Sequence, residues 1–375
     1  MIIELEELVK NGEIEIKTGP FGTQLKAAEY VESGTPVLNV KNLGYSTVVT
    51  TKVDYVGEKK LERLSMHILK EGDIVFGRKG AVDRHAYIGA NEAGWMQGSD
   101  CIRLRVKTNK INPRYLSYYF LTPKHKAFMI SMCSHGTTMA SLNQGILSKI
   151  EIDLPERCIQ DRIVSIIAVL DKKRKTNEKL NKNLEQQAQA IYSRMFIEHR
   201  QESWSTGQLS DLISVKYGKD HKKLADGNYP VYGSGGIMRY VEKPLYTGES
   251  VLIPRKGTLN NIMYVNEAFW SVDTMFYTEM LRPNIAKFVY HFVKSKDLVS
   301  LNAGSAVPSM TTNILNAMQL YIPNEKTLEK FENIVSPMYS AMQENTKESK
   351  ILANTRDALL PKLMSGELDV SDIDL

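Results

Sequence analysis

Apolar residues follow two different periods along this chain, and the same alternation between them occurs twice. Short alternating segments such as 72–76 and 250–253 are punctuated by glycine, proline and asparagine, which predicts strands joined by turns. After Pro155, and again after Pro323, apolar residues recur at three- and four-residue spacing for about 40 residues, which predicts a long amphipathic helix. The expected order is a mixed α/β segment, a long helix, a second α/β segment and a second long helix.

The second half of the chain repeats the first half. Residues 136–196 match 304–364 without a gap when they are shifted by 168 positions. The matched pairs include Gly136 and Gly304, Ser141 and Ser309, Pro155 and Pro323, and Asn177 and Asn345. With small gaps, Arg78-Lys79-Gly80 recurs as Arg255-Lys256-Gly257. A repeat of this length indicates one module used twice, and therefore a partner that offers two related sites.

The two long helices carry a heptad pattern, so the simplest partner for each is the other, in antiparallel orientation. The predicted coiled-coil core consists of Ile163, Leu170, Asn177, Leu184, Ile191, Phe331, Met338, Asn345, Leu352 and Leu359, and the apolar stripe further contains Leu180 and Ile334. A polar residue in such a core typically fixes the register. Asn177 and Asn345 occupy equivalent positions and can meet if the helices cross at their middles. The alternative is that each is a locally solvated break in the stripe.

These patterns predict an α+β fold in which two similar mixed α/β globular domains are separated by two long helices. The helices pack as an antiparallel intrachain coiled coil, and the whole has a pseudo-two-fold internal repeat. We expect the globular domains at 1–155 and 204–323, and the helical spacers at 156–203 and 324–375, the second with an acidic tail. Helices of this length would span roughly 60 Å.

Composition limits the class of protein. The 375 residues are 42% hydrophobic and 24% charged, which is typical of a globular protein with two or three domains. No apolar run approaches the ~20 residues of a membrane span, and the N-terminus has no signal-peptide pattern. Three scattered cysteines form no disulfide or zinc framework, so a cytoplasmic location is expected. The net charge of +5 permits a polyanionic partner.

Motifs for catalysis are missing from the sequence. It has no Gly-rich loop ending in Gly-Lys-Ser/Thr, no His-Glu-x-x-His helix and no cluster among its seven histidines. Glu58-Lys59-Lys60 matches the loose Glu-x-Lys pattern of some nucleases, but a solvated turn explains it as well. We therefore expect no catalytic residues and no metal site, and a protein that is not an enzyme.

Basic loops favour a binding function. The candidates in the repeated Arg-Lys-Gly loops are Arg78, Lys79, Arg84 and His85 in the first copy, and Arg255, Lys256, Asn260 and Asn261 in the second. Arginine can bind guanine bidentately, asparagine can bind adenine, and lysine can hold phosphates. A solvated basic turn would explain one such loop, but its recurrence favours a site. The copies differ after the shared core, as two readers of different sequences would.

Further candidates lie in loops rich in glycine and small residues. They are Lys17, Gln24 and Lys26 at the start of the first copy, Lys219, His221, Lys222 and Lys223 at the start of the second, and Thr137, Thr138 and Ser305 in the small-residue turns. Glycine lets the backbone approach a phosphate, and the turns could donate amides to it. The turns could equally be plain tight turns. The densest basic cluster, 172–175, is expected to be the solvated face of a helix.

Over essentially its whole length the sequence resembles the specificity subunit of type I restriction–modification systems. The resemblance is carried by the order of the segments, the Leu154-Pro155 helix entry, the closing segment 359–368, and segments 230–237 and 270–274. It adds Ser234, within 230–237, to the candidate DNA-binding residues. It implies two target-recognition domains, each of which reads one half of a bipartite, asymmetric site on double-stranded DNA.

The resemblance also implies partners. The helices would dock two methyltransferase subunits, which carry S-adenosylmethionine, and indirectly the restriction subunits, which use ATP and Mg; this chain itself would hold no cofactor. The usual Glu-Gln pair after the helix-opening proline is replaced by Ile159-Gln160 and Thr327-Leu328, which weakens a docking role for that pair. The rival interpretations are a scaffold that presents two ligand-binding domains without DNA and a self-sufficient modification enzyme, which the missing motifs disfavour.

Overall fold

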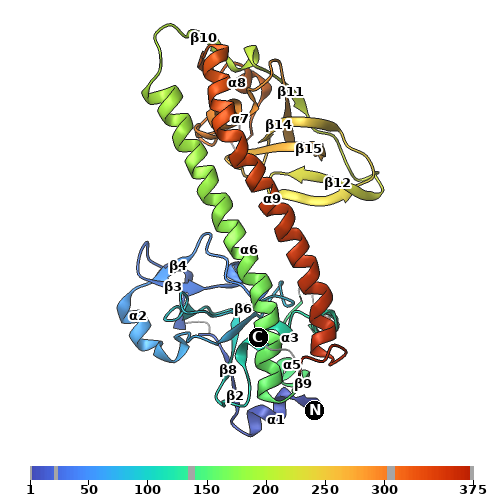
Figure 1. Ribbon diagram of the computed structural model, residues 1–375. Helices are drawn as coiled ribbons and strands as arrows, with labels where there is room; N and C mark the ends of the chain where they lie inside the picture. Colours follow the sequence, from blue (N-terminus) through green and yellow to red (C-terminus); the bar gives the residue numbers. More distant parts are fainter. Residues whose placement is uncertain (1, 21–23, 134–139, 302–308, 372–375) are drawn as a thin grey trace. The chain divides into compact units, whose positions relative to one another are not determined.

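The computed structural model describes residues 2–20, 24–133, 140–301 and 309–371 (Figure 1). The chain forms two compact units, of which the first comprises 1–175 and 348–375 and the second comprises 176–347. Each unit contains one globular domain and part of each long helix. In the described part of the chain, no helix is both long and apolar enough to cross a membrane.

The two long helices predicted from the heptad pattern are present. Helix α6 (Arg157–Tyr192) has 36 residues and continues into a π-helical turn, Ser193–Glu198. Helix α9 (Glu325–Met364) has 40 residues. Figure 1 draws α6 in green and α9 in red. Each helix begins two residues after a proline, Pro155 or Pro323, as expected from the change of period in the sequence.

Within each unit the helices pack in antiparallel orientation. In the first unit, Ile163 and Ile167 near the start of α6 share a buried core with Leu360 and Leu363 near the end of α9. In the second unit, the same relation joins Ala188 and Tyr192, near the end of α6, to Phe331 and Val335 near the start of α9. The predicted antiparallel pairing of these helices is therefore confirmed in both units.

The predicted core positions differ in how deeply they lie. Ile163, Asn177 and Phe331 are buried, whereas the other predicted core positions are half-buried: Leu170, Leu184, Ile191, Met338, Asn345, Leu352 and Leu359. Leu180 and Ile334, which the apolar stripe also included, are 44% and 40% exposed. The heptad step after Asn177 is four residues, to Asn181, so a step of three places Leu180 about 100° away around the helix. Their assignment to the stripe was wrong.

The two equivalent asparagines do meet. The amide of Asn177 donates to the main-chain oxygen of Asn345 at 3.4 Å, and the amide of Asn345 donates to Oδ1 of Asn181 at 2.8 Å. Asn181 in turn donates to the main-chain oxygen of Met342 at 3.1 Å. These bonds form a polar layer within the second unit, and a solvated break is therefore excluded. Fixing the register stays a predicted role for this layer.

The described residues of the first globular domain form three small sheets. The strand pairs and orders are β1 (Ile2–Glu4) with β9 (Glu151–Asp153); β2 (Ile14–Thr18), β8 (Cys101–Val106), β5 (Ile74–Gly77) and β6 (His85–Tyr87); and β4 (Asp54–Val56), β3 (Thr35–Leu38) and β7 (Met96–Gln97). Its short helices are α1 (Leu5–Lys10), α2 (Glu58–Arg63), α3 (Pro113–Tyr119), α4 (Pro123–Cys133) and α5 (Gln144–Ser148).

The second globular domain has a two-stranded and a six-stranded sheet. The strands are β10 (Ser205–Gln208) with β17 (Gln319–Ile322), and, in order across the larger sheet, β11 (Ile213–Tyr217), β16 (Met275–Met280), β14 (Tyr246–Pro254), β15 (Met263–Ser271), β12 (Asp226–Gly233) and β13 (Gly236–Val241). Its helices are α7 (Ala286–Lys294) and α8 (Thr312–Asn316).

The two domains repeat one topology. The pair β1–β9 corresponds to β10–β17, and the order β2-β8-β5 corresponds to β11-β16-β14. Both domains also contain a parallel strand pairing: Val37 lies opposite Met96, and Val231 lies opposite Trp270. The internal repeat read from the sequence is therefore a structural repeat as well.

Buried charges fasten each domain to the helical segments of its own unit. In the second unit, the side chain of Lys287 on α7 is 6% exposed, and its Nζ lies 2.8 Å from Oε1 of Glu249 on β14 and 2.6 Å from Oε1 of Glu332 on α9. In the first unit, Asp171 on α6 accepts hydrogen bonds from the hydroxyl of Tyr118 on α3 at 3.0 Å and from Arg356 on α9 at 3.2 Å. A buried lysine therefore anchors the second domain to α9, whereas an aspartate anchors the first domain to α6.

Candidate nucleic-acid interface

The Arg-Lys-Gly loop of each domain follows the buried end of a strand. Val75 on β5 and Leu252 on β14 have no exposed surface, and the charged residues follow within a few positions. Lys79 and Lys256 are exposed. Because the buried residues fix the start of each loop, the charged side chains can be exposed to solvent while the loop keeps its conformation.

The same backbone hydrogen bonds brace both loops from one side. The amide of Arg78 donates to the oxygen of Asp100 at 2.8 Å, and the amide of Arg255 donates to that of Thr274 at 2.9 Å. Gly80 and Gly257 have φ angles of +75° and +86°, a region that favours glycine. The glycine of the repeated motif is therefore required by the turn.

Equivalent bonds brace the loops from the other side. The amide of Leu142 donates to the oxygen of Arg78 at 2.7 Å, and the amide of Met310 donates to that of Arg255 at 2.9 Å. Leu142 and Met310 are related by the 168-residue shift of the repeat. Agreement at this level shows that the two basic loops are one structural element present twice.

The glycine-containing loops that open each domain start from equivalent close approaches. Gly19 donates to the oxygen of Cys101 at 2.9 Å, and Gly218 donates to that of Met275 at 3.0 Å. A Cβ on either glycine would lie 2.0 Å from a main-chain oxygen, that of Gly98 or Val272. Only glycine allows these strands to pack so closely.

The other candidates from the sequence lie at differing depths. Gln24, Lys26, Arg84, Lys219, Lys222 and Lys223 are exposed, whereas Lys17, Arg78, His221, Ser234 and Arg255 are half-buried. Thr137, Thr138 and Ser305 lie outside the described residues. The exposed lysines are available for phosphate contacts, which remain a prediction.

One candidate is corrected. His85 begins strand β6 with its side chain directed into the core, where it is 1% exposed and its Nε2 lies 3.0 Å from Oγ of Ser117. It packs against Phe76 and Phe120. Burial lowers the pKa of His85 to about 3, so the ring is neutral. A neutral side chain in the core cannot contact DNA, and the prediction for His85 was wrong.

Asn260 and Asn261 have structural partners in the second domain. Asn260 donates to Oδ1 of Asp297 at 3.2 Å and accepts from the amide of Leu298 at 3.0 Å. Asn261 donates to the main-chain oxygen of Ser234 at 2.7 Å, which ties the segment around Ser234 to the Arg-Lys-Gly loop. Their predicted reading of adenine stays a prediction, and these contacts give them a bracing role.

Two exposed tyrosines beside the loops were missed in the sequence. Tyr45 is 42% exposed and Tyr217 is 51% exposed. The guanidinium of Arg84 lies 5.6 Å from the ring centre of Tyr45, and that of Arg255 lies 5.4 Å from the ring centre of Tyr217. The tyrosines do not occupy equivalent positions in the repeat, so no pattern in the sequence singled them out.

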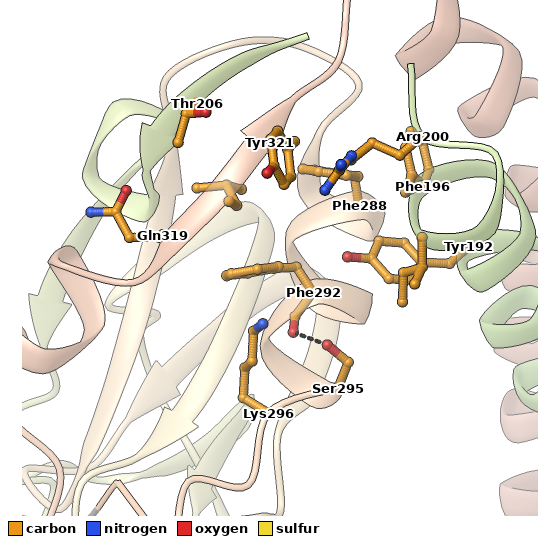
Figure 2. Close-up of a pocket in the computed structure, with 12 residues that line it drawn as sticks. Tyr192, Phe196, Arg200, Thr206, Phe288, Phe292, Ser295, Lys296, Gln319 and Tyr321 are labelled. Atoms are coloured by element: carbon orange, nitrogen blue, oxygen red, sulfur yellow. Dashed lines mark hydrogen bonds between the residues drawn. The ribbon is translucent and has the colours of Figure 1, made fainter. Parts of the chain in front are cut away.

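The second unit also contains a cavity of about 300 Å³ (Figure 2). Its lining includes several aromatic residues, among them Tyr192, Phe288 and Phe292. The guanidinium of Arg200 lies 4.1 Å from the ring centre of Tyr321 at its edge. None of the lining residues belongs to an Arg-Lys-Gly loop. Among the residues that the structure describes, no group of three or more histidine, cysteine or acidic side chains could hold a metal ion.

Two copies of one domain, each with a braced basic loop and each followed by a long helix, define a duplicated recognition module. The family model for the type I restriction modification DNA specificity domain matches residues 7–186 and 201–353. The chain belongs to this family. It is thus a specificity subunit, a class of subunit that recognises DNA and is not catalytic.

Individual relatives are similar to this chain over nearly its full length. The type I restriction enzyme MjaIX specificity subunit of Methanocaldococcus jannaschii is 21% identical, with 93% of this chain and 90% of the relative covered. The putative MjaX specificity subunit of the same organism is 26% identical, with 90% and 88% covered. The crystal structure of a type I restriction–modification S subunit from M. genitalium has a TM-score of 0.57 at 17% identity and covers 99% of this chain and 96% of its own. The last likeness shows a shared fold.

Proposed function

We propose that this chain recognises a bipartite, asymmetric site on double-stranded DNA, with one half read by each globular domain. The first target-recognition domain would comprise residues 1–155 and the second 204–323. The observation that supports this most is the pair of Arg-Lys-Gly loops, which have matching braces but different surroundings. A shared brace holds the two loops alike, while different side chains around them read different bases.

The affinity for DNA comes mainly from phosphate contacts. Exposed lysines in both domains, among them Lys79, Lys219 and Lys256, supply the charge, so binding falls with rising salt. Specificity comes from arginines that reach base edges in the major groove. This division of labour is the usual one in protein–DNA interfaces.

The helical segments 156–203 and 324–375 act as a spacer and as the docking surface for two methyltransferase subunits. Restriction subunits join through these partners. S-adenosylmethionine, ATP and Mg belong to the partner subunits, and this chain holds no cofactor of its own. Its place is the cytoplasm, where the DNA is.

Mapping of methylated bases tests the proposal. The chain is expressed with its partner methyltransferase in a host that lacks other modification systems, and modified bases are located by sequencing. We expect one motif with two separate specified halves and a fixed unspecified gap. A single continuous motif, or no sequence preference, would refute the proposal.

The spacer role has its own test. Insertion of one heptad at paired points in α6 and α9 preserves their packing and lengthens each helix by about 10 Å, or about three base pairs of DNA. We expect the gap between the half-sites to grow while the half-sites stay the same. Insertion into only one helix is the control, and it should disrupt the pair. An unchanged gap in the double insertion would exclude a spacer role.

A further inference from the structure

The first domain has an exposed aromatic ring at the far end of its Arg-Lys-Gly loop. Tyr45 stands in a short turn whose next residue, Ser46, donates its main-chain N–H to the oxygen of His85 at 2.9 Å. The hydroxyl of Tyr45 donates to Oδ2 of Asp83 at 2.8 Å. Arg84 lies over the ring at 5.6 Å, and Nζ of Lys126 lies 4.6 Å from its centre. The ring therefore holds a fixed place among charged residues.

The second domain has its ring at the opposite end of the loop. Tyr217 is the last residue of β11 and pairs with Phe276 on β16, against which its ring packs edge to face at 5.0 Å. Arg255, at the start of the Arg-Lys-Gly loop, lies over this ring at 5.4 Å. Phe276 also pairs with Ile253, so the ring and the loop share one sheet.

The two arrangements are not copies of each other. Thr18 occupies the position in the first domain that Tyr217 occupies in the second, because Thr18 pairs with Ile102 as Tyr217 pairs with Phe276. Thr18 accepts a hydrogen bond from the amide of Gln144 at 2.9 Å and offers no ring to an arginine. The same loop is therefore flanked by an aromatic ring at different ends in the two domains.

We propose that Arg84 in the first domain and Arg255 in the second are the base-reading arginines, and that Tyr45 and Tyr217 are the positioning residues that hold them. This inference rests on the proposed function and assigns residues within it. An arginine over an aromatic face is restrained by the negative charge of the ring. Nη1 of Arg255 also donates to the main-chain oxygen of Asp273 at 3.4 Å, which restrains this guanidinium further. A restrained guanidinium loses less freedom when it binds guanine through O6 and N7.

The arginines proposed to read bases do not occupy equivalent positions in the internal repeat. By sequence, Arg78 is the counterpart of Arg255, yet the aromatic ring of the first domain lies beside Arg84. The two domains would therefore present their reading arginine from different ends of one loop. This gives two readers with different reach on the same scaffold, which suits an asymmetric site.

The test uses the chain in complex with its methyltransferase and a randomised duplex DNA library. Methylated molecules are sequenced, and base discrimination is obtained at each position. We expect Arg84→Lys to lower discrimination at one position of one half-site by about 5- to 150-fold, and Arg255→Lys to do so in the other half-site. Lysine keeps the charge, so the salt dependence of binding should not change. Arg63→Lys, at an exposed arginine of helix α2 in the first domain, is the control and should leave discrimination as it is.

The positioning role is tested at the rings. Tyr45→Leu and Tyr217→Leu should each weaken base discrimination in the half-site read by the neighbouring arginine. Tyr45→Phe and Tyr217→Phe should retain discrimination because the ring remains. Tyr321→Leu is the matched control, since Tyr321 is 42% exposed and carries Arg200 over its ring but lies on another sheet. It should have no effect.

The outcomes separate this inference from the proposed function. A wild-type complex without any sequence preference would overturn both. If the wild type reads a bipartite site and both Arg→Lys variants read it equally well, the assignment of Arg84 and Arg255 is wrong. If the phenylalanine variants lose as much discrimination as the leucine variants, or the Tyr321 control loses as much, the positioning role is wrong.

Discussion

Replacement of Lys287 by methionine tests how the second domain is fastened to α9. The ammonium group is almost fully buried and lies 2.8 Å from Glu249 and 2.6 Å from Glu332. The rings of Tyr264 and Tyr339 lie 5.2 Å and 5.8 Å from it. Lys287→Met keeps the length of the side chain and removes its charge, so that two carboxylates face each other without a cation.

The size of the effect follows from the burial of the partners. Glu332 is 14% exposed and Glu249 is 31% exposed, so solvent compensates little for the lost cation. Removing one partner of a buried ion pair costs about 3–5 kcal/mol. For a unit of this size, that corresponds to a fall in melting temperature of roughly 6–20 °C.

The same group sets a pH dependence. Burial disfavours the ionised form of Glu249, but hydrogen bonds from Lys287 and Tyr264 outweigh it and hold its pKa below the usual value. A lowered pKa means that Glu249 stabilises the fold above its unfolded pKa of about 4.5, and that this is lost as the pH falls through the folded pKa. Lys287→Met should abolish this contribution.

Urea and thermal unfolding of the purified complex measure both effects. Lys243→Met, at an exposed lysine of the same unit, is the control and should change the free energy of unfolding by less than about 0.5 kcal/mol. A Lys287→Met variant that is no less stable than this control would refute a stabilising role for the buried ion pair. A second check is the triple variant with both glutamates changed to glutamine, which should regain part of the loss because no charge is left buried.

Three further predictions concern single residues. The pKa of His85 is about 3 in the fold against about 6.5 in the unfolded chain, so the unfolded chain takes up the proton first as the pH falls. The free energy of unfolding should therefore fall by up to about 1.4 kcal/mol per pH unit below pH 6.5. Unfolding of His85→Gln should show a weaker dependence on pH in this range. Gly218→Ala should destabilise by about 1–3 kcal/mol because its Cβ would lie 2.0 Å from a main-chain oxygen, whereas Gly235→Ala, with nothing within 4 Å, should be neutral in the same melts. Lys79→Ala and Lys256→Ala should each reduce the slope of log affinity against log salt by about 0.9 in a DNA-binding titration, and an unchanged slope would exclude a phosphate contact.

The architecture could be predicted from the sequence because its signals are periodic. Heptad spacing depends only on the order of apolar residues, and a repeat without gaps over 136–196 ties one half of the chain to the other. The meeting of Asn177 and Asn345 follows from their equivalent positions in two antiparallel helices. Within this pattern, Leu180 was misplaced because steps of three and four residues cannot be told apart where polar residues interrupt the stripe.

The site was predicted less completely, for reasons that differ between residues. His85 follows directly on the basic loop in the sequence, but strand β6 begins there and turns the side chain inward, and three residues are too few to reveal an alternation. Tyr45 and Tyr217 are unrelated by the repeat, so only the structure brings each to an arginine. Contacts between residues far apart in the sequence, such as Asn261 with Ser234, leave no local pattern.

Exchange of one globular domain tests the central claim most directly. Residues 204–323 are replaced by the corresponding segment of a relative with a different known target, and methylated sites are mapped in a host that carries the hybrid and the partner methyltransferase. We expect one half of the recognised motif to change while the other half and the gap between them stay as they were. A hybrid whose motif changes in both halves, or in neither, would contradict the account of two independent readers in one chain.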